Sequence, residues 1–280
     1  MSNKRSFTGF LLMIFVLFMS CKSSYRATAF KPASFIDPGN WKYETTISDE
    51  FDDTELDTAK WYSTNPGWIG RAPSLFRSSN VALKDGRLVL TGKRENVPNA
   101  PKGYHTFTSA AVQGKRKVLY GYFEIKCKPM NSSLSSAFWL YTQDSVKQEE
   151  IDIFEICGRN DRDRSYETTY FATTHYIIKP RDLKISDHVA YKTGYRLADT
   201  FIIAGLKWTR EEITWYLNGK EIRRRKNDFW HSPGTINFDS EAFPGWWGLP
   251  SDEDNGGTFE IDYFRYWSQI KEDSKSYRND

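Results

Sequence analysis

Three carboxylates within six residues, EIDIFE at 150–155, are the clearest candidates for chemistry in this 280-residue sequence. If this stretch is a β-strand, Glu150 and Asp152 lie on one face and the isoleucines on the other, because successive side chains alternate. Glu155 has the opposite parity. It joins the same face only if the strand carries an extra residue, so we predict a β-bulge near residues 153–154.

A pair of carboxylates on a cleft floor is what glycoside hydrolysis uses, one to attack the anomeric carbon and one to protonate the leaving oxygen. A third acid between them, here Asp152, separates the pKa values of its neighbours. The alternative interpretation is an acidic, solvent-facing strand edge. Like charges crowded on one strand face are destabilising, which disfavours a purely structural role.

The rest of the chain has the pattern of short strands. Period-2 segments follow one another from Trp41 onward, and Asp85-Gly86 and Asn218-Gly219 are two-residue hairpin signals. Helical periodicity is confined to the acidic segment 52–59. We therefore predict an all-β sandwich of two antiparallel sheets. The predicted strands are 81–84, 87–91, 108–112, 121–127, 137–142, 150–156, 173–178, 201–209, 212–217, 220–225 and 258–267.

The N-terminus has the features of an export signal. Residues 1–20 carry two basic residues and then an apolar run too short to span a bilayer, which predicts a signal peptide. Cys21 after a small residue resembles a bacterial lipoprotein cleavage site, which implies membrane attachment through lipidated Cys21. Ordinary secretion is the alternative. Residues 21–40 are a predicted tether, 41–270 the main domain and 271–280 a polar tail.

Composition excludes several classes of protein. The net charge is +3, and most of it belongs to the leader, so no nucleic-acid-binding surface is predicted. The basic run 223–226 is interpreted as a solvated edge that discourages strand pairing. Aromatic residues make up 16% of the chain, and exposed flat rings hold sugar faces. Three cysteines do not make a disulfide scaffold, and Cys127 and Cys157 are predicted to be buried thiols.

The stretch at 150–155 resembles the E-x-D-x-x-E signature of glycoside hydrolase family 16 in its bulged version. Segments 120–130, 136–140 and 259–267 resemble strands of the same family, and the likeness runs over about residues 45–268. The resemblance implies a jelly roll whose concave sheet forms an open cleft. It also implies that Glu150 is the nucleophile, Glu155 the acid/base and Asp152 an assisting residue, with retention of anomeric configuration.

The loop 65–73 carries a Trp-x-Gly-Arg pattern formed by Trp68 and Arg71. It resembles the red-algal galactan hydrolases, porphyranases above all, in which the Trp stacks on galactose and the Arg contacts the neighbouring unit or its sulfate. A guanidinium fork suits sulfate as it suits phosphate. The structural alternative is that Trp68 caps the end of the sandwich.

Five further residues are implied as substrate contacts by the same resemblance. Trp139 is expected on the floor beside the nucleophile, and His175 near the acid/base. Glu241 resembles the cleft-rim acid of agarases and porphyranases. The alternatives are a core tryptophan for Trp139, a structural histidine for His175 and a self-paired surface loop for Arg159. The full set is Trp139, His175, Glu241, Trp246 and Arg159.

The sequence predicts no catalytic cofactor and one structural metal site. The sequence has no His/Cys cluster with zinc spacing, and no organic cofactor is implied. Many relatives in the family carry a structural calcium far from the cleft. By that resemblance, Asp262 with Gly86 and Glu50 is the expected calcium site.

The sequence thus predicts an exported, monomeric, retaining endo-β-galactanase. Its expected substrate is sulfated porphyran first, then furcellaran or carrageenan, then agarose. Laminarin and mixed-linkage glucans share the signature, but the loops at 65–73 and 240–250 do not resemble glucanase loops. A non-catalytic carbohydrate-binding lipoprotein is the main rival, since jelly rolls host many lectins. A pure binder has no use for three acids, and an adhesin would leave the arginines unexplained.

Overall fold

The computed structural model describes residues 41–270. Within that range the regular structure consists of strands and five short 3-10 helices, without an α-helix. None of the helices described there is long and apolar enough to cross a membrane. The predicted signal peptide, Cys21, the tether and the polar tail lie outside the described residues.

The described part of the chain contains seventeen strands. They are β1 Trp41–Tyr43, β2 Trp61–Tyr62, β3 Ser74–Phe76, β4 Val81–Lys84, β5 Arg87–Thr91, β6 Phe107–Ser109, β7 Ala111–Gly114, β8 Gly121–Lys128, β9 Ser136–Gln143, β10 Lys147–Ile156, β11 Thr169–Ile178, β12 Leu183–Lys192, β13 Ile202–Trp208, β14 Glu212–Leu217, β15 Lys220–Lys226, β16 Thr235–Asp239 and β17 Thr258–Gln269. The 3-10 helices are η1 Ser78–Asn80, η2 Arg164–Thr168, η3 Lys179–Arg181, η4 Leu197–Asp199 and η5 Asp252–Asp254.

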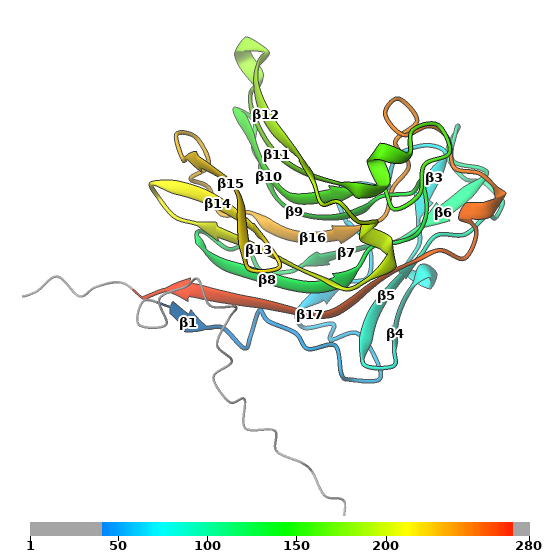
Figure 1. The fold of residues 1–280 in the computed structure, drawn as a ribbon, viewed down its shortest axis with the longest axis horizontal. Coiled ribbons are helices and arrows are strands. Elements are labelled where there is room, and N and C mark those ends of the chain that lie inside the picture. Colours follow the sequence, from blue (N-terminus) through cyan, green and yellow to red (C-terminus); the bar gives the residue numbers. More distant parts are fainter. Residues whose placement is uncertain (1–40, 271–280) are drawn as a thin grey trace, which may run out of the picture. The chain divides into compact units, whose positions relative to one another are not determined.

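Most strands belong to two antiparallel sheets that form the layers of a sandwich (Figure 1). The first, which we call the β10 sheet, has the order β12-β11-β10-β9-β16-β7-β2. The second, the β17 sheet, has the order β15-β14-β13-β8-β17-β5-β4, and β1 pairs with β17. Strands β3 and β6 form a separate parallel pair. The all-β sandwich predicted from sequence is confirmed.

Two hairpin turns have the predicted geometry. Asp85 and Gly86 have φ angles of 52° and 69°, and Asn218 and Gly219 have φ angles of 49° and 81°. Positive φ at both central residues is the type I′ turn, whose twist matches that of the flanking strands. The turns therefore set the pairing of β4 with β5 and of β14 with β15.

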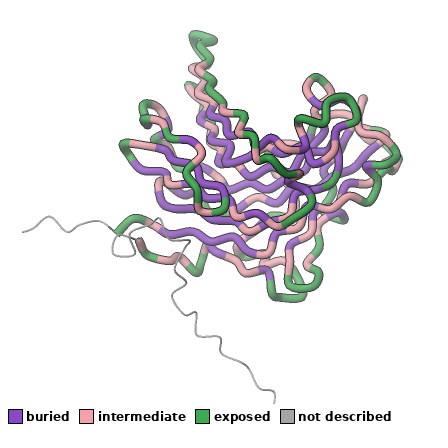
Figure 2. Tube along the Cα trace, viewed as in Figure 1, coloured by how far each residue is buried: buried purple, intermediate pink, exposed green. Residues whose placement is uncertain are grey.

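The core between the sheets is rich in aromatic rings. Phe138 lies 5.1 Å from Phe238 within the β10 sheet and 5.8 Å from Phe264 of the β17 sheet, measured between ring centroids. Cys127 and Cys157 are buried free thiols, as predicted. Figure 2 shows that buried residues run along the strands of both layers, whereas exposed residues gather at hairpin tips.

Some boundaries differ from the prediction. The predicted strand 108–112 is two strands, β6 and β7, which belong to different sheets. The segment 52–59 forms bends and a turn rather than a helix, and most of it is exposed. Strands β12 and β16 are not predicted from the sequence at all, although both belong to the β10 sheet.

The basic run at the end of β15 lies on an edge strand, as predicted, and Arg224 and Lys226 are exposed, but Arg223 is not solvated. Arg223 is buried, and its guanidinium donates to the Ala172 carbonyl at 2.5 Å and to Asp187 Oδ2 at 2.6 Å. It also stacks over the Trp215 ring at 4.5 Å. Arg224 has the opposite parity and pairs with two glutamates of β14 and β15. Alternation along β15 therefore directs one arginine into the sandwich and its neighbour outward.

This difference predicts unequal contributions to stability. Arg223→Met should lower the free energy of unfolding by about 2–4 kcal/mol, because it leaves a buried carbonyl without its charged donor. Arg224→Met should change it by no more than about 0.5 kcal/mol, because exposed ion pairs contribute little. Urea denaturation of both variants measures the difference. Equal losses would contradict the inward placement of Arg223.

Candidate active site

Strand β10 carries the three carboxylates and contains the predicted β-bulge. Its register shifts against β11 between Asp152 and Glu155, and against β9 between Asp152 and Phe154. The shift brings Glu155 to the face that already holds Glu150 and Asp152, and all three line one cleft. The two isoleucines of the stretch and Phe154 are buried in the core. The bulge and the shared face are therefore confirmed.

Strand pairing places two of the predicted substrate residues beside these acids. Glu150 lies opposite His175 on β11, and Asp152 lies opposite Trp139 on β9. Directly opposite residues of paired strands point to the same face of a sheet. His175 and Trp139 therefore belong to the floor of the same cleft, which they both line.

The cleft has a volume of about 890 Å³ and is walled by aromatic rings. Trp68 stands edge-on to Trp139 with ring centroids 6.2 Å apart, and Trp246 contacts Phe171 at 4.7 Å. All four residues line the cleft. The three tryptophans are only half-buried, so they are not core residues. Flat, partly exposed rings suit the apolar faces of sugar units.

The surroundings in the cleft shift the pKa values of Glu150 and Glu155 by different interactions. Burial raises the pKa of Glu155 to about 8, and the charges of Glu241 and Glu150 add to the rise. Burial also raises the pKa of Glu150 to about 7, against a hydrogen bond from Gln148 and the charge of Arg71. The charges of other acids therefore favour the protonated form of Glu155, whereas a donated hydrogen bond and a cation favour the ionised form of Glu150. This is the difference that a general acid and a nucleophile need.

Asp152 lies between them and is buried. Its Oδ2 has no hydrogen-bond partner among the described residues and lies 3.5 Å from His175 Nε2. Burial, followed by the charges of Glu150 and Glu155, raises the pKa of Asp152 well above its ordinary value. Burial lowers the pKa of His175, whose Nδ1 lies 2.8 Å from Ser186 Oγ. Both shifts favour the uncharged forms of these side chains, as burial requires.

The position of His175 corrects one expectation. The resemblance predicts a cleft residue near the acid/base, but His175 pairs with Glu150 and its Nε2 lies 4.0 Å from Glu150 Oε1. It therefore lies at the Glu150 end of the acidic stretch on β10. The reason is the antiparallel register of β10 and β11, which places Phe171 rather than His175 opposite Glu155.

Arg71 and Glu241 form an ion pair on the cleft wall. Arg71 Nε donates to Glu241 Oε2 at 2.7 Å, and the guanidinium stacks over the Phe243 ring at 4.5 Å. Burial and the charge of Asp239 raise the pKa of Glu241 to about 8, although Arg71 opposes the rise. The Arg71 side chain remains 49% exposed. Its terminal nitrogens thus stay accessible from the cleft while its Nε is held.

Sequence reasoning missed Asp239, the last residue of β16. Asp239 Oδ2 accepts a hydrogen bond from Trp139 Nε1 at 2.7 Å, and the residue is buried beside the cleft. The one available signal was its spacing of two residues from Glu241. On an extended chain, residues two apart point to the same side. The site therefore holds a fifth carboxylate besides those predicted.

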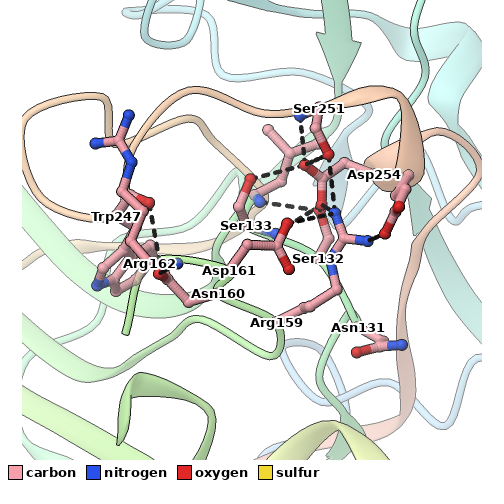
Figure 3. Close-up of polar contacts among 12 residues, drawn as sticks. Asn131, Ser132, Ser133, Arg159, Asn160, Asp161, Arg162, Trp247, Ser251 and Asp254 are labelled. Carbon is pink, nitrogen blue, oxygen red and sulfur yellow. Dashed lines mark hydrogen bonds and ion pairs between the residues drawn. The ribbon is translucent and has the colours of Figure 1, made fainter. Parts of the chain in front are cut away.

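Arg159 corrects another expectation, because it does not line the cleft. Figure 3 shows its guanidinium directed at Asp254 and Ser251, and Nη2 lies 3.1 Å and 3.0 Å from their oxygens. Asp254 is buried and also accepts hydrogen bonds from Ser132 and Ser133. These acceptors occupy the side chain. Arg159 therefore ties the loop after β10 to η5 and to the loop before β9 instead of contacting substrate.

The residues expected to hold calcium are engaged with cationic side chains. The Glu50 carboxylate accepts hydrogen bonds from Arg265 at 2.8 Å and 2.7 Å, and Asp262 accepts one from Lys126 at 2.7 Å. Gly86 lies in the exposed β4–β5 turn. Calcium needs several oxygen ligands around one point. As arranged, these residues do not fit that requirement, and calcium has no part in the mechanism below.

Among residues 41–270, one group of acidic and histidine side chains is compact enough to share a metal ion. Glu150, Asp152 and His175 bring ligand atoms within 4.8 Å of one another. The same three side chains lie together because Glu150 and Asp152 share one face of β10 and His175 lies opposite Glu150.

The geometry agrees with a comparison against protein families. The family model described as "Beta-porphyranase A-D, GH16 domain" matches residues 41–269, which include every strand of the sandwich. The chain belongs to glycoside hydrolase family 16. As a family 16 protein it is a glycoside hydrolase, and its carboxylates at 150, 152 and 155 occupy the strand that carries the family signature.

Two similar proteins and one solved structure show what this family 16 chain resembles. It is 31% identical over 231 residues to beta-porphyranase B of Zobellia galactanivorans, which covers 75% of this chain and 78% of that protein. It is 24% identical over 276 residues to the kappa-carrageenase of Pseudoalteromonas carrageenovora, covering 83% and 66%. The crystal structure of porphyranase B from Zobellia galactanivorans superposes with a TM-score of 0.73 at 26% identity, covering 86% of this chain and 100% of that one. The jelly-roll fold is thus shown.

Proposed function

We propose that this protein is an endo-acting hydrolase of β-galactosidic bonds in a sulfated red-algal galactan, porphyran first, and that it retains anomeric configuration. The observation that carries the proposal is a single cleft that combines Glu150, Asp152 and Glu155 with Arg71 on its wall. The match to a porphyranase family model and the 31% identity to a beta-porphyranase support the choice of polymer.

In this mechanism the two glutamates exchange roles within one cycle. The Glu150 carboxylate attacks the anomeric carbon while Glu155 gives its proton to the glycosidic oxygen, so the bond to the leaving chain breaks and a glycosyl ester forms on Glu150. Glu155, now ionised, takes a proton from water. The water oxygen attacks the anomeric carbon and releases Glu150. Retention in this manner requires carboxyl groups about 5–5.5 Å apart.

The position of Arg71 supports the choice of a sulfated substrate. Its Nε donates a hydrogen bond to Glu241 Oε2 at 2.7 Å, and Phe243 packs against one face of the guanidinium. The planar fork is therefore held in one orientation while its terminal N–H groups remain accessible. A fork fixed in this way binds a sulfate ester through two parallel, charge-assisted hydrogen bonds. Trp68, whose ring centroid lies 6.0 Å from the Arg71 guanidinium carbon, supplies a stacking face for the adjoining sugar unit.

A side-by-side assay of new reducing ends on porphyran, agarose, furcellaran, κ-carrageenan and laminarin tests the proposal, with Glu150→Gln as the blank. We expect porphyran to be cleaved most rapidly. Preferred cleavage of κ-carrageenan or furcellaran would keep the catalytic roles and change the position of the recognised sulfate. Cleavage of agarose or laminarin alone would refute the sulfate role of Arg71. Binding without cleavage of any polymer would favour the carbohydrate-binding rival.

Arg71→Met should lower kcat/KM on the sulfated galactan by about 10–100-fold, the value of one or two hydrogen bonds to a charged group. The loss on desulfated polymer should be several times smaller. Because this substitution strands Glu241 in a buried position, the double variant with Glu241→Gln is the better measure of sulfate recognition. Arg116→Met, on an exposed arginine outside the cleft lining, is the matched control. Equal losses on sulfated and desulfated polymer would contradict the assignment.

A further inference from the structure

Asp239 is a buried carboxylate on the cleft-facing side of β16, and only one of its two oxygens has a hydrogen-bond partner. Its side chain is 1% exposed, and it is not among the residues that line the cleft. Oδ2 accepts the hydrogen bond from Trp139 Nε1 at 2.7 Å, whereas Oδ1 has no hydrogen-bond partner in the described part of the chain. A buried acceptor without a partner is costly. An acid at this position therefore has some role besides accepting the hydrogen bond from the Trp139 indole.

The strand register shows which group Asp239 faces. Asp239 on β16 lies opposite Ala137 on β9, and Ala137 lies opposite Glu155 on β10. Residues that lie opposite one another in neighbouring strands point to the same face. Asp239 and Glu155 therefore project from the same face of the sheet on either side of one strand, and that strand contributes only the methyl group of Ala137 between them.

The surroundings of Asp239 are mostly acidic. Glu155, Glu150 and Asp152 of β10 interact with it electrostatically, Glu241 lies two residues along its own chain, and Arg71 of the loop 65–73 is the nearby cation. Strand β7, on the other side of β16, contributes an alanine opposite Asp239. Burial and the charge of Glu155 raise the pKa of Asp239 to about 7, although the Trp139 hydrogen bond and Arg71 oppose the rise. Ionisation of either carboxyl, Asp239 or Glu155, therefore disfavours ionisation of the other.

We propose that Asp239 is a positioning residue with two effects: it orients the Trp139 indole, and its negative charge across Ala137 favours the protonated form of Glu155. The inference rests on the proposed acid/base role of Glu155. A purely structural role would need only a hydrogen-bond acceptor for the indole. Asn has such an acceptor in nearly the same shape, so Asp239→Asn keeps the structural role and removes the charge.

Direct titration of Glu155 tests the inference without any substrate. Side-chain carboxyl carbons of ¹³C-labelled glutamate are followed by NMR against pH, and Glu155→Gln assigns the resonance. In Asp239→Asn we expect the Glu155 titration midpoint to fall by about 0.5–1 pH unit, since a neighbouring negative charge no longer opposes ionisation. Glu260→Gln, which removes a carboxylate of the β17 sheet that pairs with Arg87, is the matched control and should leave the midpoint unchanged.

The pH profile of kcat/KM supplies a second readout. Its basic limb should move to lower pH by the same amount in Asp239→Asn, with KM near the wild-type value because Trp139 stays in place. Asp239→Ser, equally uncharged, replaces this variant if it does not fold. An unchanged Glu155 midpoint in the uncharged variant overturns the inference. Failure of the wild-type enzyme to cleave any galactan would instead refute the proposed function and leave the NMR titration to decide the role of Asp239.

Discussion

Glu150→Gln is expected to lower kcat on the cleaved galactan by roughly four orders of magnitude or more, because an amide cannot attack the anomeric carbon and no covalent intermediate forms. The side chain keeps its size and its position opposite His175. The hydrogen bond that Gln148 donates to Glu150 Oε2 at 3.1 Å has an acceptor in the amide oxygen of the variant. The loss should therefore appear in kcat, with little change in the affinity for oligosaccharide.

Three measurements separate this loss from unfolding. Reducing-end release gives the activity, thermal unfolding gives the stability, and affinity electrophoresis in a gel that contains the polymer gives binding. Glu260→Gln makes the same chemical change on the other sheet and should keep full activity. A Glu150→Gln enzyme that turns over at more than about a hundredth of the wild-type rate would move the nucleophile to another residue, since that loss is what removal of an assisting group produces.

The part of the site that lies along one strand was predictable from the sequence. The parity of Glu155 required an extra residue in β10, and the register shift confirms it. The Asp85-Gly86 turn was predictable for a similar reason, since its residue types fit one turn geometry. Strand β12 was missed although Leu183, Ile185, Val189 and Tyr191 alternate along it with mostly polar residues. Asp187 interrupts this alternation, and most of the strand is exposed because it lies at the edge of its sheet.

Contacts between distant segments were beyond the reach of sequence patterns. Asp239 meets Trp139 because β16 lies beside β9, although 100 positions separate the two residues. Arg71 and Arg159 are both loop arginines beside aromatic or acidic residues, yet only one reaches the cleft. The difference is the buried Asp254, which holds the Arg159 guanidinium at 3.1 Å. Residue type gives the chemistry that a side chain can perform, and strand order decides what it meets.

Glu155→Ala should lower kcat/KM on the polymer by about 10²–10⁴-fold, the usual contribution of general acid catalysis. Because burial raises the pKa of Glu155 to about 8, the wild-type acid is protonated at neutral pH and activity should fall as the pH rises through that value. On the acidic side, activity should fall as Glu150 becomes protonated, with its pKa raised to about 7. The wild-type profile is therefore expected to be a narrow bell, and the variant should lose its basic limb.

The leaving group gives the sharper test of the same residue. In an aryl glycoside of the product oligosaccharide, the aryloxide departs without needing a proton. Formation of the glycosyl-enzyme from this substrate should therefore be almost unaffected in Glu155→Ala, whereas cleavage of the polymer requires the acid. Breakdown of the glycosyl-enzyme then lacks a base, and a burst of aryl alcohol should precede a slow steady state. Azide needs no deprotonation, so it should restore turnover and yield a glycosyl azide of retained configuration. Equal losses on polymer and aryl glycoside, with no effect of azide, would remove Glu155 from the acid/base role. They would point to Glu241, the other buried glutamate on the cleft wall, whose pKa is also raised to about 8.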